Sequence, residues 1–496
     1  MRLPSCLLVL VSLTAAAYAQ YDPAAADGDA PLVPAHTGMK LYVGRDSQAL
    51  FRPIFINQFW AKATHNNPGT AERDGEGAAE WSPTFGVRRV RLLFLAEVGE
   101  RVQGFAQIGI NNQTFATGGG SGTGGVGGYG QAKKPQVFVH DAWGQYRLSY
   151  TPKAASGAYA GFPKSLYVGA GLHPFVGLSR LSQAGIPTHM VLDFPIVNFP
   201  DIERGSQFAR QFGVYIKGDV RRLHYRAAVN QPFVNDGRPP ARFGDRDPTA
   251  PTPGTRLIVD YPTSDLAYTA YAEWRFGEWE GHVLPFRPFT YVGTKRLLNV
   301  GAGFYAQPGA AATYDVIDDG LGGTTQLDDT HAKSVWAADV YAEQPGNGGE
   351  AYTAYLVHYG YDFGPGYYRS FGLLNTAPGT AFPAFNGERV VDGFGNAEPL
   401  MGTGDITQLQ LGYLWPASVL GGGMRLQTYG AVIRKDLDFL GVATYRYDLG
   451  ANLFLGGHAA KLSANLALRP QVFARGGTFE ADGHRGEVVV QAQVAL

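Results

Sequence analysis

The amino-acid sequence predicts an all-β fold, a transmembrane antiparallel β-barrel of about 16 strands with long extracellular loops and short periplasmic turns. Three observations predict it: recurrent segments in which apolar and polar side chains alternate, connections that are alternately short and long, and an N-terminal export signal. A sheet in lipid has to close on itself, because an open edge would leave backbone N–H and C=O groups unpaired.

The first residues have the pattern of a cleaved signal peptide. Arg2 supplies the positive charge, an apolar run ends at Ala17, and the small residues Ala17 and Ala19 predict cleavage before Gln20. A membrane anchor is the alternative, but this run is too short to span a bilayer. The expected organisation is a signal peptide at 1–19, a mobile N-terminal lead-in at 20–38 and a single β-barrel domain at 39–496. The expected location is the outer membrane of a Gram-negative-type bacterium.

Alternation with a period of two residues marks the predicted strands. Between residues 210 and 220, Phe212, Val214 and Ile216 share one face, whereas Tyr215 and Lys217 share the other. Segments of this kind are about ten residues long, the length that crosses a bilayer at a tilt. Their predicted starts lie near residues 50, 85, 101, 137, 164, 209, 221, 266, 296, 334, 351, 405, 423, 443, 459 and 486. The even number suits a closed bacterial barrel.

The connections between these segments differ in length in the way that periplasmic turns and extracellular loops do. Short connections are predicted at 99–100, 220–221 and 456–457. Long connections are predicted at 116–136, 177–205, 235–261, 307–333, 371–404 and 476–486.

The composition suits strands with one face in lipid and one in water. Aromatic residues make up 13% of the chain and glycines 67 of 496 residues, yet the mean hydropathy is only −0.13. We expect many Tyr, Trp and Phe side chains to form girdles at the two membrane interfaces. Without Arg2 the chain has 40 basic and 42 acidic residues, a net charge of −2, which gives no support to a nucleic-acid partner. Cys6 is the only cysteine and lies in the signal peptide, so the mature chain has no disulfide.

No motif in the sequence indicates an enzyme, a cofactor or a metal site. The tract 118–130 contains a formal G-x-G-x-x-G, but it lacks a βαβ context and is better interpreted as a flexible loop. Aspartates at 315, 318, 319, 328 and 329 could hold calcium, but their spacing is not that of an EF-hand and a solvated acidic loop is favoured. The histidines have no paired metal-ligand spacing, and neither a G-x-S-x-G elbow nor a Ser/His/Asp set can be assigned.

The connection at 177–205 is unusually apolar. It carries ten large apolar side chains, including Leu181, Met190 and Phe194, and such a loop would be unfavourable in water. It has to pack, and the sequence leaves two alternatives open: folding into the lumen, where it would narrow a pore, or covering the barrel rim or a neighbouring subunit. Its basic residues, Arg180 and Arg204, are the candidates at a constriction.

The polar faces of the predicted strands carry more basic than acidic residues, twelve against eight. A pore selects through the charge and width of its lining, so this excess favours anions. Pairing between basic and acidic residues across strands is the alternative, and it would leave no net field. The candidates for pore-lining residues are Arg89, Arg91, Arg101, Lys217, Arg222, Arg226 and Arg275.

Several short stretches resemble the phosphate-selective porin O and P family. They are Gly86–Leu92, Val139–Tyr146, Leu166–Ser179 and Arg210–Gly213, in about the second quarter of the chain. The resemblance implies a homotrimer of sixteen-stranded barrels, each with an inward-folded loop that corresponds to about 175–208 here.

The sequence therefore predicts a porin: a water-filled channel for passive diffusion of small solutes, with a mild preference for phosphate-like anions, no cofactor and no enzymatic activity. Its expected partners are outer-membrane lipid, small anionic solutes and two further copies of the chain. Two alternatives stay open: a plugged structural or assembly barrel without a transport role, and a secreted soluble β-protein.

Overall fold

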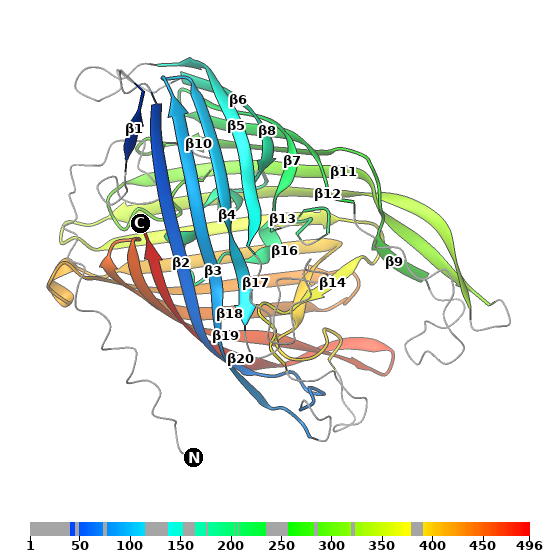
Figure 1. Cartoon of the computed structure of the whole chain (residues 1–496). Helices are drawn as coiled ribbons and strands as arrows, with labels where there is room; N and C mark the ends of the chain where they lie inside the picture. The colour runs from blue at the N-terminus through cyan, green and yellow to red at the C-terminus, as the bar shows by residue number, and fades with distance from the viewer. Residues whose placement is uncertain are drawn as a thin grey trace.

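The computed structural model describes residues 40–44, 49–72, 77–114, 137–151, 164–174, 177–202, 204–206, 208–234, 256–281, 286–318, 323–377 and 390–496. Within them, 18 strands form one antiparallel sheet. Two of these, β1 and β9, are short additions to the margins, and the remaining sixteen close into a barrel through the pairing of β2 with β20 (Figure 1). The predicted signal peptide, lead-in and glycine tract lie outside the described residues.

The sixteen wall strands follow one another around the barrel in chain order. They are β2 (Ala49–His65), β3 (Trp81–Val98), β4 (Val102–Thr114), β5 (Phe138–Tyr150), β6 (Lys164–His173), β7 (Gln211–Val220), β8 (Leu223–Gln231), β10 (Ala267–Arg275), β11 (Leu297–Ile317), β12 (Thr324–Pro345), β13 (Ala351–Asp362), β16 (Gly404–Leu414), β17 (Arg425–Leu437), β18 (Ala443–Gly456), β19 (Ala460–Arg475) and β20 (Thr478–Ala495). Each of the sixteen predicted segments corresponds to one of them, so the predicted fold class is confirmed. The start of β20 was predicted eight residues too late and that of β12 ten residues too late.

Smaller elements complete the description. The strands β1 (Leu41–Val43) and β9 (Arg256–Asp260) pair with β2 and β11, and β14 (Tyr368–Phe371) pairs with β15 (Glu398–Gly402) as a separate sheet of two strands. Short 3-10 turns occur at η4 (Leu181–Gln183), η5 (Ile186–Thr188), η6 (Ile196–Asn198) and η7 (Ala417–Val419). The described residues contain no helix with the length and apolar composition needed to cross a bilayer.

Alternate residues of each strand face opposite sides of the wall, as the period-two pattern predicts. In β7, Phe212 and Val214 are 61% and 56% exposed on the outside, whereas Lys217 is buried inside. In β20, Val488 and Val494 are exposed, and Gln491 between them is buried. The outer face is therefore apolar and the inner face polar, which is the arrangement of a barrel that faces lipid.

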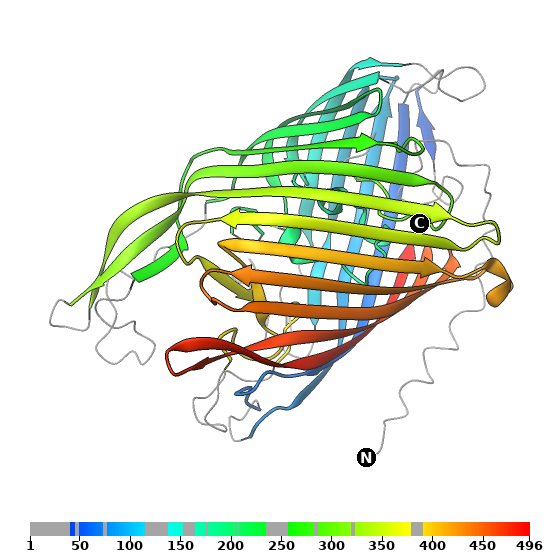
Figure 2. The ribbon, with the colours of Figure 1, turned by 180° about the vertical axis from the view of Figure 1, so that it is seen from behind.

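The two ends of the barrel differ. We call the end at which β2 begins and β20 stops the terminal end, and the opposite end the loop end. The short connections predicted at 99–100, 220–221 and 456–457 all lie at the terminal end. At the loop end, β11 and β12 project beyond their neighbours with β9 beside them (Figure 2).

Four of the predicted long connections contain strand. Residues 307–333 are largely the outer ends of β11 and β12, residues 476–486 are a turn at Gly476 and Gly477 followed by β20, and the connections 235–261 and 371–404 contain β9 and β15. The predictions for 307–333 and 476–486 were wrong because strand that projects beyond an apolar layer has water on both faces and needs no apolar alternation. In the segment 307–333, Asp315 and Asp328 pair with Arg256 of β9 at 3.1 and 3.4 Å. Part of the acidic cluster is therefore paired.

The aromatic residues divide between the two faces of the wall. Trp81, Phe85 and Trp336 are exposed on the outside, but many tyrosines of β10 to β13 point inward and are buried, among them Tyr355 and Tyr359. The prediction that many aromatic residues form interface girdles did not cover these inward tyrosines, which were not predicted. A buried tyrosine needs a partner for its hydroxyl group, and the interior supplies one.

Candidate functional site

The loop between β6 and β7 lies inside the barrel. Near its start, the Gly177 N–H donates to Thr269 Oγ1 of β10 over 2.8 Å, and the Arg180 N–H donates to Asp339 Oδ2 of β12 over 2.6 Å. The open question about this apolar loop is thereby answered in favour of the lumen.

The same loop reaches the opposite wall. The Leu192 N–H donates to the Tyr429 hydroxyl of β17 over 3.1 Å, and Lys461 Nζ of β19 donates to the carbonyl oxygens of Pro187 and His189 over 3.2 and 3.1 Å. Contacts from β10 around to β19 mean that the loop crosses the whole interior and narrows it.

Burial of apolar side chains holds the loop there. Leu178, Met190 and Val197 are buried in one cluster with the inward tyrosines of β12 and β13. The loop satisfies the hydroxyl groups of two of these tyrosines, since Tyr359 donates to the Asn198 side chain and Tyr361 to the Val197 carbonyl. Tyr341 and Tyr355 donate to carboxylates of the wall. The apolar side chains of the loop and the inward tyrosines therefore pack against each other inside the barrel.

A second segment enters from the terminal end. It connects β10 to β11, and its backbone pairs with the loop where the Gly185 N–H donates to the Arg287 carbonyl over 2.8 Å and the Arg287 N–H donates to the Gln183 carbonyl over 3.0 Å. Buried ion pairs join the two segments and the wall: Arg180 with Glu280 at 2.7 Å, and Arg287 with Glu273 at 2.7 Å. Two segments from opposite ends of the barrel thus meet inside it.

One side of the loop faces a group of arginines, which we call the arginine pocket. Arg88, Arg89 and Arg91 of β3 and Arg210 before β7 line a space of about 50 Å³ beside Phe194. A bulge in β3 turns both Arg88 and Arg89 inward, because the pairing with β2 skips from Gln58 opposite Arg89 to Phe59 opposite Val87.

Two carboxylates accompany these four arginines. Asp193 of the loop accepts from Arg88 Nε at 2.6 Å and from Arg89 Nη2 at 2.8 Å, and Asp141 pairs with Arg210 at 3.2 Å. Burial alone would raise the pKa of Asp193, but the neighbouring Arg88 and Arg89 outweigh it and lower that pKa to about 2. Asp193 is therefore ionised at neutral pH, and four positive charges face two negative ones.

Arg91 differs from the other three arginines. It donates to the Asn111 side chain and lies 2.8 Å from His140 Nε2, and no carboxylate among the described residues is within ion-pair distance of it. The excess of positive charge in the arginine pocket is therefore centred near Arg91.

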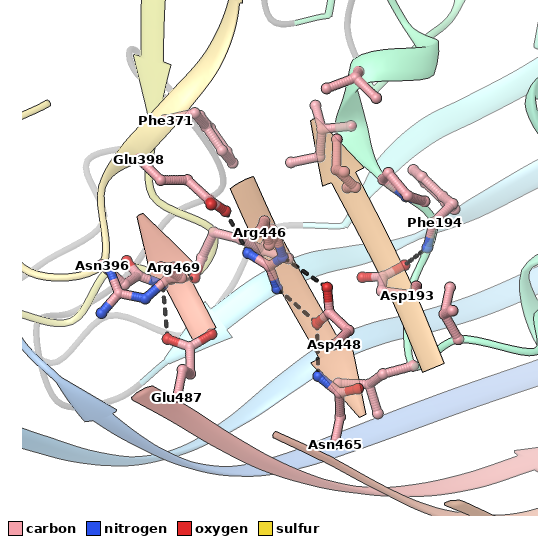
Figure 3. Close-up of a pocket in the computed structure, with 18 of the residues that line it drawn as sticks. Asp193, Phe194, Phe371, Asn396, Glu398, Arg446, Asp448, Asn465, Arg469 and Glu487 are labelled. Carbon is pink, nitrogen blue, oxygen red and sulfur yellow. Dashed lines mark hydrogen bonds and ion pairs between the residues drawn. The ribbon is translucent and has the colours of Figure 1, made fainter. Parts of the chain in front are cut away.

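The other side of the loop faces a pocket of mixed character, which we call the mixed pocket (Figure 3). It has about 100 Å³ of space, and Phe194 and Phe371 line both pockets. Arg446 lies between Asp448, at 2.9 Å, and Glu398. The charged residues of the lining are Asp193, Glu398, Asp448, Glu487, Lys435, Arg446 and Arg469. Asp193 is already paired with Arg88 and Arg89, so the rest of this lining carries three positive and three negative charges. Lys62, outside the lining, pairs with Glu487 at 3.3 Å.

The predicted pore-lining residues occupy two kinds of position. Five of them are buried on the inner wall: Arg89, Arg91, Lys217, Arg226 and Arg275. The other two lie near the turns of the terminal end, where Arg101 is exposed and donates to the Arg147 and Leu148 carbonyls, and Arg222 donates to the Arg275 and Phe276 carbonyls. Arg101 belongs to the turn before β4, where the alternation of the strand does not yet hold.

The two predicted constriction residues also differ. Arg180 is buried in the ion pair with Glu280, whereas Arg204 is 40% exposed and pairs with Asp260 at 2.9 Å. The sequence prediction missed Arg88, Arg210 and Asp193. Asp193 had a signal, because it is the single acidic residue between 178 and 200 in an otherwise apolar loop. Nothing in the pattern of β3 indicated the bulge that turns Arg88 inward.

Comparisons with known proteins give a distant likeness to outer-membrane proteins. No family model matches the chain, and no curated protein matches it. Among solved structures, the outer membrane channel DcaP of Acinetobacter baumannii is similar at 11% identity over 92% of this chain and 99% of that chain, with a TM-score of 0.44. OprB of Pseudomonas putida is similar at 10% identity over 89% and 94% of the two chains, with a TM-score of 0.45. An anion-selective porin from Comamonas acidovorans is similar at 11% identity over 90% and 100%, with a TM-score of 0.40. Likenesses this distant carry no argument about function, and the description of this chain as a sixteen-stranded antiparallel barrel stands on its own strand pairing.

Proposed function

We propose that this chain is an outer-membrane porin that lets small solutes diffuse passively and favours anions. The observation that carries the proposal is the arginine pocket, where four arginines face two carboxylates beside the loop that narrows the lumen.

The outer surface supports the membrane location. Large apolar side chains are exposed on strands all around the wall, for example Leu92, Val214, Leu356 and Leu466. Such a band is unfavourable in water and suits the hydrocarbon layer of a bilayer. The predicted signal peptide is consistent with export to the outer membrane.

The chemistry of the arginine pocket supports the anion preference. An arginine stays charged at any physiological pH, and its planar fork suits the oxygens of phosphate or carboxylate. A narrow passage with low-dielectric walls strengthens the field of such charges relative to open water. The resemblance to phosphate-selective porins would make phosphate-like oxyanions the solutes and a homotrimer the assembly, and both belong to this proposal.

The test is electrical recording from purified, folded protein in a planar bilayer. A potassium chloride gradient should give a reversal potential of the sign expected for chloride-selective conductance, and the selectivity should weaken at high ionic strength as salt screens the arginines. A cation-selective channel would contradict the anion preference. Folded protein that inserts but never conducts would contradict the channel itself and leave a plugged barrel.

A further inference from the structure

The mixed pocket contains buried polar atoms that nothing in the described part of the chain satisfies. Gln408 of β16 is buried, lines this pocket, and has no hydrogen-bond partner for either its Oε1 or its Nε2. A buried amide left without partners is unfavourable, because it has given up its hydrogen bonds to water. Because Gln408 faces a cavity, a ligand in that cavity would supply the missing partners.

Three further orphan atoms belong to the same lining: Asn396 Oδ1, Glu398 Oε2 and Arg469 Nε. In Figure 3, Asn396 and Arg469 lie beside Glu487, and Glu398 extends toward Arg446. Their other polar atoms are engaged, since Asn396 Nδ2 donates to Glu487 over 3.0 Å and Arg469 Nη1 donates to Asn67 over 3.1 Å. With Gln408, the unsatisfied atoms comprise three acceptors and two donors.

The rest of the wall defines the chemistry of the ligand further. Phe194, Phe371 and Trp60 supply aromatic surface, and Trp60 is held in place because its Nε1 donates to Gln491 over 2.7 Å. The charged groups balance, as counted above, so the pocket offers little attraction to a net charge. A hydroxyl group both donates and accepts, and C–H faces pack on aromatic rings.

We propose that the mixed pocket binds a small, uncharged, hydroxyl-rich solute such as a monosaccharide. The space of about 100 Å³ is large enough, since one water needs about 10–15 Å³ by the same measure. This site is separate from the arginine pocket and lies across the loop from it, so the barrel offers one subsite for anions and another for neutral solutes. The inference relies on the proposed function only for the route by which the solute arrives.

The test measures binding directly, so that it does not depend on conduction. Isothermal titration calorimetry of the full-length, detergent-solubilised protein with D-glucose should give saturable heat, and glycine and inorganic phosphate should not compete for it. In Gln408→Met, which keeps the length of the side chain but removes both amide atoms, glucose affinity should fall at least about tenfold, because two hydrogen bonds to the solute are lost.

The chain provides a matched control two residues along. Gln410 is on the same inward face, is equally buried and also has an unpartnered amide, but it does not line the mixed pocket. Gln410→Met should leave glucose affinity unchanged. Equal losses in the two variants, absence of saturable glucose binding to the wild type, or displacement of glucose by glycine or phosphate would each overturn the proposal. Gln408→Ala provides a second variant if Gln408→Met does not fold, as judged by its heat-dependent migration on a gel. A protein that binds glucose but does not conduct would refute the proposed channel and leave this inference standing.

Discussion

Arg180 and Glu280 meet inside the barrel although they enter it from opposite ends, with Arg180 Nη2 2.7 Å from Glu280 Oε1 and both side chains buried. Arg180 belongs to the loop between β6 and β7, and Glu280 to the segment between β10 and β11. The pair is reinforced by Arg287, whose guanidinium contacts Glu273 and Glu280. These ion pairs join the loop between β6 and β7 to the segment between β10 and β11, and join that segment to β10.

Breaking this pair should be costly. Arg180→Met leaves Glu280 buried without its main counter-charge, and removal of one partner from a buried ion pair costs about 3–5 kcal/mol. The free energy of unfolding, measured by urea titration in lipid vesicles, should fall by about that amount. Arg256→Met is the control, because Arg256 is 58% exposed in its pair with Asp315 and such pairs contribute about 1 kcal/mol or less. Similar losses in the two variants would contradict the structural role of the buried pair.

A glycine on β11 sets how closely the loop can approach the wall. A Cβ atom at Gly303 would lie 2.4 Å from the Leu178 carbonyl oxygen and 2.6 Å from that of Gly177, closer than atoms can pack. Gly303→Ala should therefore displace the loop, lower stability by about 1–3 kcal/mol and change the single-channel conductance. Gly104→Ala is the control, since its Cβ would meet nothing within 4 Å. Unchanged conductance in Gly303→Ala would argue against the loop as the constriction.

Asp193 and Arg91 should have opposite effects on ion selectivity. Asp193→Asn removes the counter-charge of Arg88 and Arg89, so the reversal potential in a salt gradient should move further toward anions. Arg91→Gln removes a positive charge from the same pocket. The reversal potential should then move toward cation selectivity, most clearly at low ionic strength. Arg256→Gln, outside the lumen, carries the same charge change as Arg91→Gln and should have little effect. Shifts of the same sign in Asp193→Asn and Arg91→Gln would refute the electrostatic explanation.

A charged residue on the outward face of β19 should destabilise the barrel. Leu466 is 39% exposed on the outside of the barrel, and Leu466→Arg should cost about 2–4 kcal/mol if the residue lies near the bilayer midplane. Leu466→Phe keeps the position apolar and should cost much less. The measurement is urea unfolding in lipid vesicles, and equal costs for the two changes would mean that this face does not contact lipid.

The loop end should contain a carboxyl group that responds to mild acid. Burial raises the pKa of Asp392 from 3.8 to about 6, and the Tyr368 hydroxyl donates to it. Because the folded state holds this proton more tightly than the unfolded state, the contribution to stability is full below about pH 4 and declines as the pH rises through 6, by at most about 3 kcal/mol. Asp392→Asn should flatten this part of the pH dependence of thermal unfolding, followed by gel migration. Asp482→Asn, at an exposed site, should leave it unchanged, and a pH dependence that survives in Asp392→Asn would assign it to other groups.

The barrel itself could be predicted from the sequence because alternation is a local property. Each strand places apolar and polar residues on opposite faces, so Phe212 and Val214 outside and Lys217 inside follow from their positions in the chain. The same rule identified all sixteen wall strands. It failed where strands leave the apolar layer, as in the outer parts of β11, β12 and β20, because there both faces meet water and the pattern disappears.

The interior was decided by tertiary structure. The apolar composition of the loop between β6 and β7 indicated that it is buried. Where it is buried could not be predicted, because its partners on β10, β12, β17 and β19 are distant in sequence. The sequence likewise showed an inward excess of basic residues without showing which of them are neutralised. The bulge that turns Arg88 inward and the position of Asp193 on the loop determine which arginines are neutralised. The effect of a charge on its surroundings depends on the counter-charge that folding places beside it.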